Sequence, residues 1–220
     1  MSREIELKIP LTKAQFSQIE DFLLGRTKIA FLSVREVSKI FKNDEYFSLY
    51  KTHEERLKNK ELRVIRIRTI RCAEKSIQVS QGEIKILGDK PQSGDKSYFC
   101  IKQKTLQNGV EFNSEHETFV EQPEVLRAFF AATGYSKWFE KTKDALSALV
   151  SLAGFEAHLE LEKVNELPYA EIEYTKDDLA PDEVRSSLEK ILTALGLDPK
   201  KRDSRSWSEI LESGNLKTEN

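Results

Sequence analysis

The chain has 220 residues, which suits one compact domain with a buried hydrophobic core. Charged residues make up 33% of it, yet 35 Lys and Arg against 37 Asp and Glu leave a formal net charge of only -2. This balance argues against a generally basic surface, so we expect no nucleic-acid partner. Any function that depends on charge must come from how the charges are clustered.

The sequence contains no segment typical of secretion or membrane insertion. The opening MSREIELKIP has no apolar stretch of signal-peptide length, and no run of about 18 apolar residues occurs. We therefore expect a cytoplasmic protein without a membrane partner. Cys72 and Cys100 lack metal-ligand spacing, and His53, His116 and His158 are scattered, so a zinc site is not expected. The oligomeric state stays open.

Strictly alternating segments predict strands with one charged face. In EIELKI, residues 4–9, Glu4, Glu6 and Lys8 point one way and apolar residues the other. In ELRVIRIRTI the same alternation sets Arg66 and Arg68 on one face. The first face is mainly acidic and the second is basic.

The second half of the chain repeats this pattern. YFCIKQKT and EFNSEHETFV, joined by the turn QNG, indicate a β-hairpin. WFEKTK, HLELEKV and YAEIEYT indicate three further strands. Their same-face charged pairs are Lys102 and Lys104, Glu115 and Glu117, Lys141 and Lys143, Glu160 and Glu162, and Glu171 and Glu173.

Three amphipathic helices are expected between the strands, over residues 13–24, 123–134 and 181–195. The stretch 145–154, ALSALVSLAG, is ambiguous between strand and helix. Residues 74–96 are rich in Lys, Ser, Gly and Asp and indicate a hydrophilic hairpin or excursion. We predict one α+β domain over 1–212 with a largely antiparallel sheet, and a short polar tail over 213–220.

Any single strand with a charged face could lie on a solvated sheet. Here, however, the opposite faces are apolar and the helices can cover them, so the charged faces line the interior if the sheet closes. Confining these charges costs desolvation energy that pairing only partly offsets, which favours an ionic ligand. The predicted interior set is Glu4, Glu6, Glu115, Glu117, Glu160, Glu162, Glu171 and Glu173 against Lys8, Arg66, Arg68, Lys102, Lys104, Lys141 and Lys143.

The residue types in this set suit two kinds of ligand. Arg offers forked donors and Lys a point charge, so cations on several strands suit a chain of phosphates. Neighbouring carboxylates about 4 Å apart repel by roughly 4 kcal/mol at an effective dielectric constant of about 20, and a hard divalent cation relieves that repulsion.

These segments resemble the CYTH superfamily of triphosphate tunnel metalloenzymes, which includes class IV adenylyl cyclases, thiamine triphosphatases and inorganic tripolyphosphatases. Residues 4–8, EIELK, resemble its Glu-x-Glu-x-Lys signature. The matches continue in order with DEYF at 44–47, LRVIRIR at 62–68 and LEKVNELPYAEIE at 161–173. WSEIL at 207–211 resembles a terminal motif with Trp in place of Tyr.

The resemblance implies a closed antiparallel β-barrel with helices packed outside, and a tunnel that binds a small-molecule triphosphate with Mg²⁺ or Mn²⁺. Lys8, with Glu6, would be catalytic by orienting substrate or assisting proton transfer. The implied metal ligands are Glu4, Glu6, Glu171 and Glu173. The implied phosphate-binding residues are Lys8, Arg66, Arg68, Lys102, Lys104, Lys141 and Lys143. Whether Glu115, Glu117, Glu160 and Glu162 contact metal or only balance the cations stays open.

Three positions depart from the pattern and leave the substrate preference open. Asn113 and Lys143 stand where Arg is common, and Pro168 replaces a frequent Gly. Trp138 and Trp207 are expected to pack in the core or at the rim, and His158 to be a hydrogen-bonded barrel residue.

We expect a divalent-metal-dependent triphosphatase that releases phosphate from inorganic tripolyphosphate or from an organic triphosphate such as thiamine triphosphate. The alternative is an adenylyl cyclase that makes cyclic AMP and pyrophosphate from ATP, and the third possibility is a noncatalytic module that binds polyphosphate or nucleotide. The cyclase is disfavoured because its signature carries a His-Phe pair before Glu-x-Glu-x-Lys, and only three residues precede Glu4. No aromatic cage for a base or thiamine is visible, which favours tripolyphosphate.

Overall fold

A computed structural model describes residues 2–61, 63–80, 83–87, 94–107, 110–176 and 178–215. Within these ranges it describes the backbone but not the side chains of residues 2–3, 72–80, 83–87, 104–107, 110–113 and 214–215.

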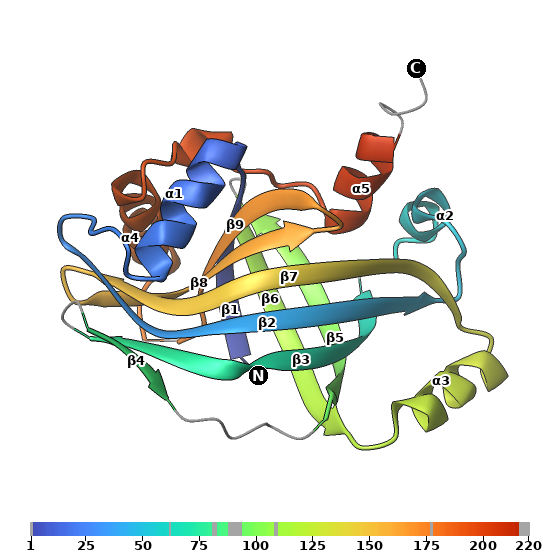
Figure 1. The fold of residues 1–220 in the computed structure, drawn as a ribbon. Helices are drawn as coiled ribbons and strands as arrows, with labels where there is room; N and C mark the ends of the chain where they lie inside the picture. Colours follow the sequence, from blue (N-terminus) through green and yellow to red (C-terminus); the bar gives the residue numbers. More distant parts are fainter. Residues whose placement is uncertain are drawn as a thin grey trace.

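Long strands dominate the described chain, and short helices connect them (Figure 1). In chain order the elements are β1 (Ser2–Pro10), α1 (Lys13–Leu23), β2 (Leu32–Ser48), α2 (His53–Lys58), β3 (Arg63–Ser80), β4 (Glu83–Leu87), β5 (Lys96–Gln107), β6 (Val110–Val120), α3 (Pro123–Ala132), β7 (Ser136–Leu152), β8 (Phe155–Val164), β9 (Leu167–Tyr174), α4 (Pro181–Ala194), a 3-10 turn (Pro199–Lys201) and α5 (Trp207–Asn215).

All the described strand pairs are antiparallel, and the sheet closes on itself. The strand order is β2-β7-β8-β9-β1-β6-β5-β3-β4, and β2 also pairs with β3. This additional pairing joins the two ends of the series and leaves β4 as an extension of β3. The predicted closed antiparallel barrel of an α+β protein is therefore confirmed.

The register of the strands brings the predicted charged faces together inside the barrel. Glu6 of β1 lies opposite Glu173 of β9, and Lys8 lies opposite Glu171. Lys102 of β5 lies opposite Glu115 of β6 in the same way. Because side chains that are directly opposite project from the same side of a sheet, each row continues around the interior.

The hydrophobic core lies outside the barrel wall, between β1 and its neighbours and helices α1 and α4. Leu7 of β1, Leu23 of α1 and Leu188 of α4 belong to one buried cluster. Figure 1 shows α1 and α4 packed together over this side of the sheet. Full burial of a Leu side chain contributes about 1.5–3 kcal/mol, so these contacts fix which strand face points inward.

The three predicted helices are confirmed. The capping box that Thr12 and Gln15 suggested is present at the start of α1, and Pro123 and Pro181 begin α3 and α4. The ambiguous stretch 145–154 mostly continues strand β7, which ends at Leu152.

Two short helices have no counterpart in the prediction. In α2, the side chain of Thr52 accepts from the amide of Glu55 (3.1 Å) and caps the first turn. Helix α5 covers the WSEIL motif at 207–211, for which no secondary structure is predicted, and it buries Trp207 against Tyr169. Neither helix exceeds nine residues, so neither gives a strong periodic signal.

The hydrophilic segment 74–96 begins as a continuation of β3, which pairs with β4 from Ser76 opposite Leu87 to Ser80 opposite Glu83. The rest of that prediction, over 81–82 and 88–93, lies outside the described residues. So does the end of the predicted polar tail beyond Asn215. In the described part of the chain, every helix is too short or too polar to cross a membrane.

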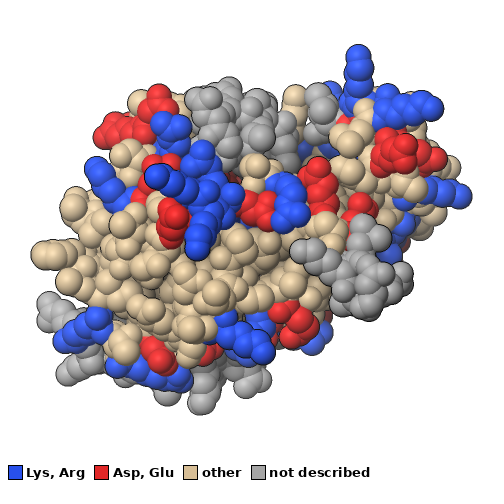
Figure 2. Space-filling view, turned by 90° about the horizontal axis from the view of Figure 1, so that it is seen from above, with Lys and Arg blue, Asp and Glu red and all other residues tan. Residues whose placement is uncertain are grey.

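The outer surface mixes charges of both signs. Figure 2 shows, on one face, Lys and Arg beside Asp and Glu rather than a field of one sign. On this face the exterior therefore offers no electrostatic footprint for a polyanion.

Candidate functional site

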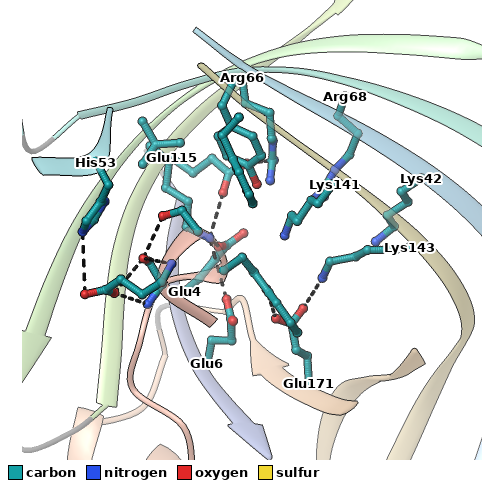
Figure 3. A pocket seen from close by; sticks show the side chains of 18 of the residues that line it. Glu4, Glu6, Lys42, His53, Arg66, Arg68, Glu115, Lys141, Lys143 and Glu171 are labelled. Carbon is teal, nitrogen blue, oxygen red and sulfur yellow. Dashed lines mark hydrogen bonds and ion pairs between the residues drawn. The ribbon is translucent and has the colours of Figure 1, made fainter. Parts of the chain in front are cut away.

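The barrel encloses a cavity of about 540 Å³ (Figure 3). Its lining combines side chains from strands that are distant in the sequence. Of the predicted interior set, the lining contains Glu4, Glu6, Arg66, Arg68, Lys102, Glu115, Glu117, Lys141, Lys143, Glu160, Glu171 and Glu173.

Two predicted residues are placed differently, and a third cannot be compared. Lys8 is 3% exposed and lies beneath the lining, where its Nζ donates to the carbonyl oxygen of Arg205 (2.7 Å). Glu162 is also buried behind the lining, at 0% exposure. The side chain of Lys104 lies outside the described part of the structure.

Cations occupy one continuous part of the barrel wall. Strand β2 lies between β7 and β3. Lys141 and Lys143 project inward from β7, Lys42 from β2, and Arg66 and Arg68 from β3. We call these five residues the cationic wall.

Carboxylates occupy the other part. Strands β8, β9 and β1 are neighbours in the sheet, and β6 follows β1. In Figure 3, Glu4, Glu6 and Glu171 lie below the labelled members of the cationic wall. The carboxylate wall consists of Glu160 of β8, Glu171 and Glu173 of β9, Glu4 and Glu6 of β1, and Glu115 and Glu117 of β6.

Lys102 of β5 lies outside the cationic wall, next to the carboxylate wall. Its Nζ lies 3.0 Å from Glu4 Oε2, 3.8 Å from Glu6 Oε2 and 3.4 Å from Glu115 Oε2. Burial opposes the charge of Lys102, but these carboxylates outweigh it and raise its pKa. Burial would also raise the pKa of Glu115, yet Lys102 and Arg66 lower it to about 2.

Lys143 joins the two walls. Its Nζ lies 2.7 Å from Glu162 Oε2 and donates to Glu171 Oε2. Burial and then the charge of Glu171 raise the pKa of Glu162 to about 8, against the effect of Lys143. Burial would also raise the pKa of Glu171, but Lys143, Lys141 and Lys8 hold it well below its usual range. Glu171 therefore carries the charge, and Glu162 takes a proton more easily.

A hard divalent cation fits this corner of the cavity. Each of Glu160, Glu162 and Glu171 offers a carboxylate oxygen within 4.8 Å of the others. Although Glu162 lies close to Lys143, neither of its buried oxygens has a hydrogen-bond partner among the described residues. Lys143 is the cation in direct contact with both Glu162 and Glu171, and Lys141 adds positive charge nearby. Oxygen ligands around an incompletely satisfied carboxylate suit Mg²⁺ or Mn²⁺.

This group shares only Glu171 with the four metal ligands that the resemblance implied. Among the described side chains, Glu4, Glu6 and Glu173 belong to no group this tight. Glu4 and Glu6 instead face Lys102, and Glu173 Oε1 lies 3.0 Å from His158 Nδ1.

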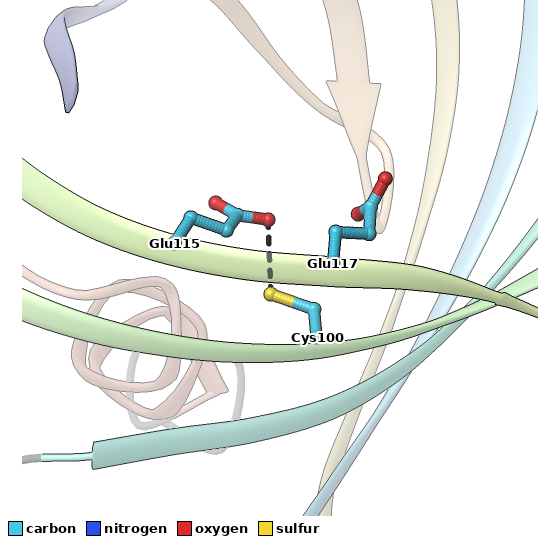
Figure 4. A group of neighbouring side chains, drawn as sticks. All are labelled: Cys100, Glu115 and Glu117. Carbon is cyan, nitrogen blue, oxygen red and sulfur yellow. Dashed lines mark hydrogen bonds between the residues drawn. The ribbon is translucent and has the colours of Figure 1, made fainter. Parts of the chain in front are cut away.

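A second tight group contains the buried thiol of Cys100 with Glu115 and Glu117 (Figure 4). The thiol donates to Glu115 Oε1 over 2.9 Å. Burial and Glu115 raise the pKa of Cys100 to about 12, although Arg66 opposes them. The thiol therefore stays protonated and acts as a hydrogen-bond donor.

The sequence prediction did not include Lys42, and it assigned no role to Asp44 although the DEYF motif at 44–47 contains it. Lys42 donates a hydrogen bond to Glu160. Asp44 accepts two hydrogen bonds, from Nε and Nη2 of Arg68. Lys42, Asp44 and Tyr46 alternate along β2, but Asn43 and Glu45 make the opposite face polar too, so period-two spacing alone does not show which face is inside.

Aromatic and polar residues from α2, β7 and α5 complete the lining. Arg56 lies over the ring of Trp138, 4.1 Å from its centre, and His53 Nε2 lies 3.7 Å from Glu209 Oε1. Trp207 packs as expected, but its Nε1 also donates to Glu171 Oε1 (2.8 Å). His53, Arg56 and Glu209 had no predicted role, because the short helices α2 and α5 bring them to the barrel.

The same fold occurs in solved structures. A protein from Pyrococcus horikoshii matches with a TM-score of 0.66 and 18% identity over 96% of this chain and 99% of its own. A conserved hypothetical protein from Pyrococcus furiosus matches with a TM-score of 0.60 and 18% identity over 94% of this chain and 98% of its own. A proposed adenylate cyclase from Vibrio parahaemolyticus matches with a TM-score of 0.56 and 16% identity over 95% of this chain and 97% of its own.

Searches of protein-family profiles and of curated sequences find no match to this chain. Structural similarity at this level of identity identifies the fold. The chain therefore shares its fold with these proteins, and the motifs in its strands resemble those of the CYTH, or triphosphate tunnel, superfamily.

Proposed function

We propose that this protein is a divalent-metal-dependent enzyme that hydrolyses a small-molecule triphosphate, either inorganic tripolyphosphate or an organic triphosphate such as thiamine triphosphate, and releases phosphate. The observation that supports this most is the division of one cavity into a cationic wall and a carboxylate wall. A binder of phosphate alone needs only the first wall, whereas a metal-dependent phosphoryl-transfer enzyme needs both.

The cationic wall would bind the phosphate chain. Its members come from three adjacent strands, so their charges can follow an extended polyanion. Arg66 and Arg68 offer forked donors, while Lys42, Lys141 and Lys143 offer point charges. A cavity of about 540 Å³ also lies within the range of small-molecule sites.

The carboxylate wall would hold Mg²⁺ or Mn²⁺. Glu160 and Glu171 of this wall, with Glu162 behind it, form the donor group that fits best, and Glu4, Glu6 and Glu173 remain candidates from the motif. When bound, a divalent ion would neutralise part of the phosphate charge and polarise the phosphoryl group that water attacks. Lys143 would then exchange its carboxylate contacts for phosphate oxygens.

The attacking water needs a group that orients it. We assign this to Glu6 and Glu173, which are opposite each other on β1 and β9 and both line the cavity. Lys8 would act from behind the lining, because it holds the Arg205 carbonyl and lies 5.1 Å from the centre of the Trp207 ring.

The test offers tripolyphosphate, thiamine triphosphate and ATP separately, with magnesium or manganese, and resolves the products. Orthophosphate release that is lost in Glu6→Gln, but retained in the exterior variant Glu54→Gln, supports the hydrolase. Cyclic AMP with equimolar pyrophosphate would instead establish the cyclase. Salt-sensitive binding without turnover would identify a noncatalytic module.

A further inference from the structure

Asp44 lies behind the cationic wall. Its side chain is 0% exposed and is not part of the cavity lining, whereas its contacts Arg66, Arg68 and Lys141 are. Its pairing partners across the sheet are Arg68 of β3 and Lys141 of β7. These cations therefore separate Asp44 from any ligand in the cavity.

Three cations converge on this one carboxylate. Arg68 donates from Nε to Oδ1 over 2.6 Å and from Nη2 to Oδ2 over 2.9 Å. Arg66 Nη1 and Lys141 Nζ lie 3.8 Å and 3.6 Å from Oδ2. Tyr46 donates its hydroxyl to the same oxygen over 3.4 Å. The forked contact with Arg68 is the geometry in which guanidinium also binds phosphate.

The charge of Asp44 persists in this buried position. Burial would raise its pKa, but Arg68, Arg66 and Lys141 outweigh that effect and hold the pKa well below its usual range. The carboxylate also matters to its partners, because burial and Lys143 lower the pKa of Lys141 and Asp44 opposes them.

We propose that Asp44 is a positioning residue, an internal counter-anion that holds Arg66, Arg68 and Lys141 together before substrate binds and competes with phosphate for their charge. This inference rests on the proposed function, because it requires the cavity to bind a polyphosphate. It adds a residue that touches no ligand but sets how strongly the cationic wall attracts one.

The substitution Asp44→Asn separates this role from a purely structural one. It keeps the size of the side chain and removes the charge. Without a ligand, the buried cations lose their counter-anion and the protein becomes less stable. Polyphosphate then replaces the missing charge, so it binds more tightly, by roughly threefold to tenfold for one unit charge near the site. A residue that only supports the barrel would, on removal, loosen the cavity and weaken binding.

The measurement is the Kd of tripolyphosphate by isothermal titration calorimetry in EDTA, at low and at high sodium chloride, with melting temperatures with and without the ligand. Asp95→Asn is the matched control, because Asp95 accepts from the same two nitrogens of Arg71, over 2.9 Å each, on the exposed surface. We expect Asp44→Asn to lower the melting temperature, tighten binding and enlarge the ligand-induced shift. Asp95→Asn should behave as the wild type.

Equal or weaker binding by Asp44→Asn, when the wild type binds, would overturn this inference alone. If the wild type itself binds neither tripolyphosphate nor thiamine triphosphate, in EDTA or with magnesium, both the proposed function and this inference fail. If Asp44→Asn does not fold, the double variant Asp44→Asn with Arg68→Gln removes one charge of each sign and is expected to fold. Failure of the double variant as well would show that compensation of charge is not the role of Asp44.

Discussion

Trp207 in α5 donates a hydrogen bond from its indole Nε1 to Oε1 of Glu171 in β9, over 2.8 Å. The other oxygen of Glu171 accepts from Lys143. Glu171 belongs both to the metal ligands that the resemblance implies and to the acidic group with Glu160 and Glu162. Helix α5 thus holds this carboxylate in place. Its orientation depends on the docking of α5.

Trp207→Phe should therefore weaken this corner of the site, because phenylalanine keeps an aromatic ring there but has no indole N–H to donate to Glu171. Loss of one hydrogen bond to a charged acceptor is expected to lower the free energy of unfolding by about 1.5–3 kcal/mol. Urea unfolding followed by circular dichroism measures this. Trp138 makes no such bond to Glu171, so Trp138→Phe should lower the free energy of unfolding by less. An equal decrease in both variants would contradict the role of the bond.

Lys42 is expected to bind phosphate although the motifs did not indicate it. Lys42→Met should weaken tripolyphosphate binding by about tenfold or more and flatten its dependence on salt, because one charge of the wall is lost. The control is Lys39→Met on the same strand, where Lys39 is exposed and pairs with Asp144. Calorimetric titration should find the Kd of the control unchanged, and similar effects of both variants would remove Lys42 from the site.

Glu171→Gln should reduce the affinity for Mn²⁺, because it removes a charged oxygen from the group with Glu160 and Glu162. Glu156→Gln alters the partner of Arg35 near the start of β8, outside the cavity lining, and should leave metal affinity unchanged. Mn²⁺ binding by electron paramagnetic resonance distinguishes the two. Unaltered Mn²⁺ affinity in Glu171→Gln would place the metal elsewhere.

Glu162 predicts a specific dependence of stability on pH in EDTA. Burial, then Glu171, raise its pKa from 4.5 to about 8 in the folded protein. Below pH 4.5, the pKa of an ordinary Glu, both the folded and the unfolded chain hold the proton, so Glu162 makes its full contribution to stability. As the pH rises toward 8, only the folded protein retains the proton, and the stability contributed by Glu162 is lost.

The side chain in Glu162→Gln is neutral throughout this range. The melting temperature of this variant should therefore change less between pH 4.5 and about pH 8 than that of the wild type. Glu54→Gln on the exposed side of α2 should follow the wild type. Parallel curves for wild type and Glu162→Gln would mean that Glu162 does not take up a proton on folding.

The alternating strands made much of the barrel predictable, because in β1 and β9 the apolar face meets α1 and α4 while the charged face turns inward. In β2 this rule fails. Asn43 and Glu45 lie on the outer face with Phe41, while Lys42 and Asp44 are buried. Glu45 is held there by Arg127 of α3, so both faces of this strand are polar and the direction of the interior cannot be read from the residues alone.

The position of Lys8 depends on a contact that local patterns do not contain. Its inward direction follows from alternation, but its acceptor, the carbonyl of Arg205, lies 197 residues away in the sequence. Similarly, Glu160 and Glu171 lie opposite each other because of the register between β8 and β9. Residue types therefore predicted a charged cavity, while the grouping of carboxylates and cations required the closed sheet.

The central claim, that one cavity holds a triphosphate and a divalent ion together, is tested most directly by thermal unfolding with neither ligand, with tripolyphosphate, with magnesium, and with both. Since the cationic and carboxylate walls belong to one cavity, we predict a shift with both ligands that exceeds the sum of the separate shifts. Arg66→Ala should reduce the tripolyphosphate shift and Glu171→Gln the magnesium shift, and each should abolish the excess. Shifts that are merely additive in the wild type, or that persist unchanged in both variants, would contradict a shared site.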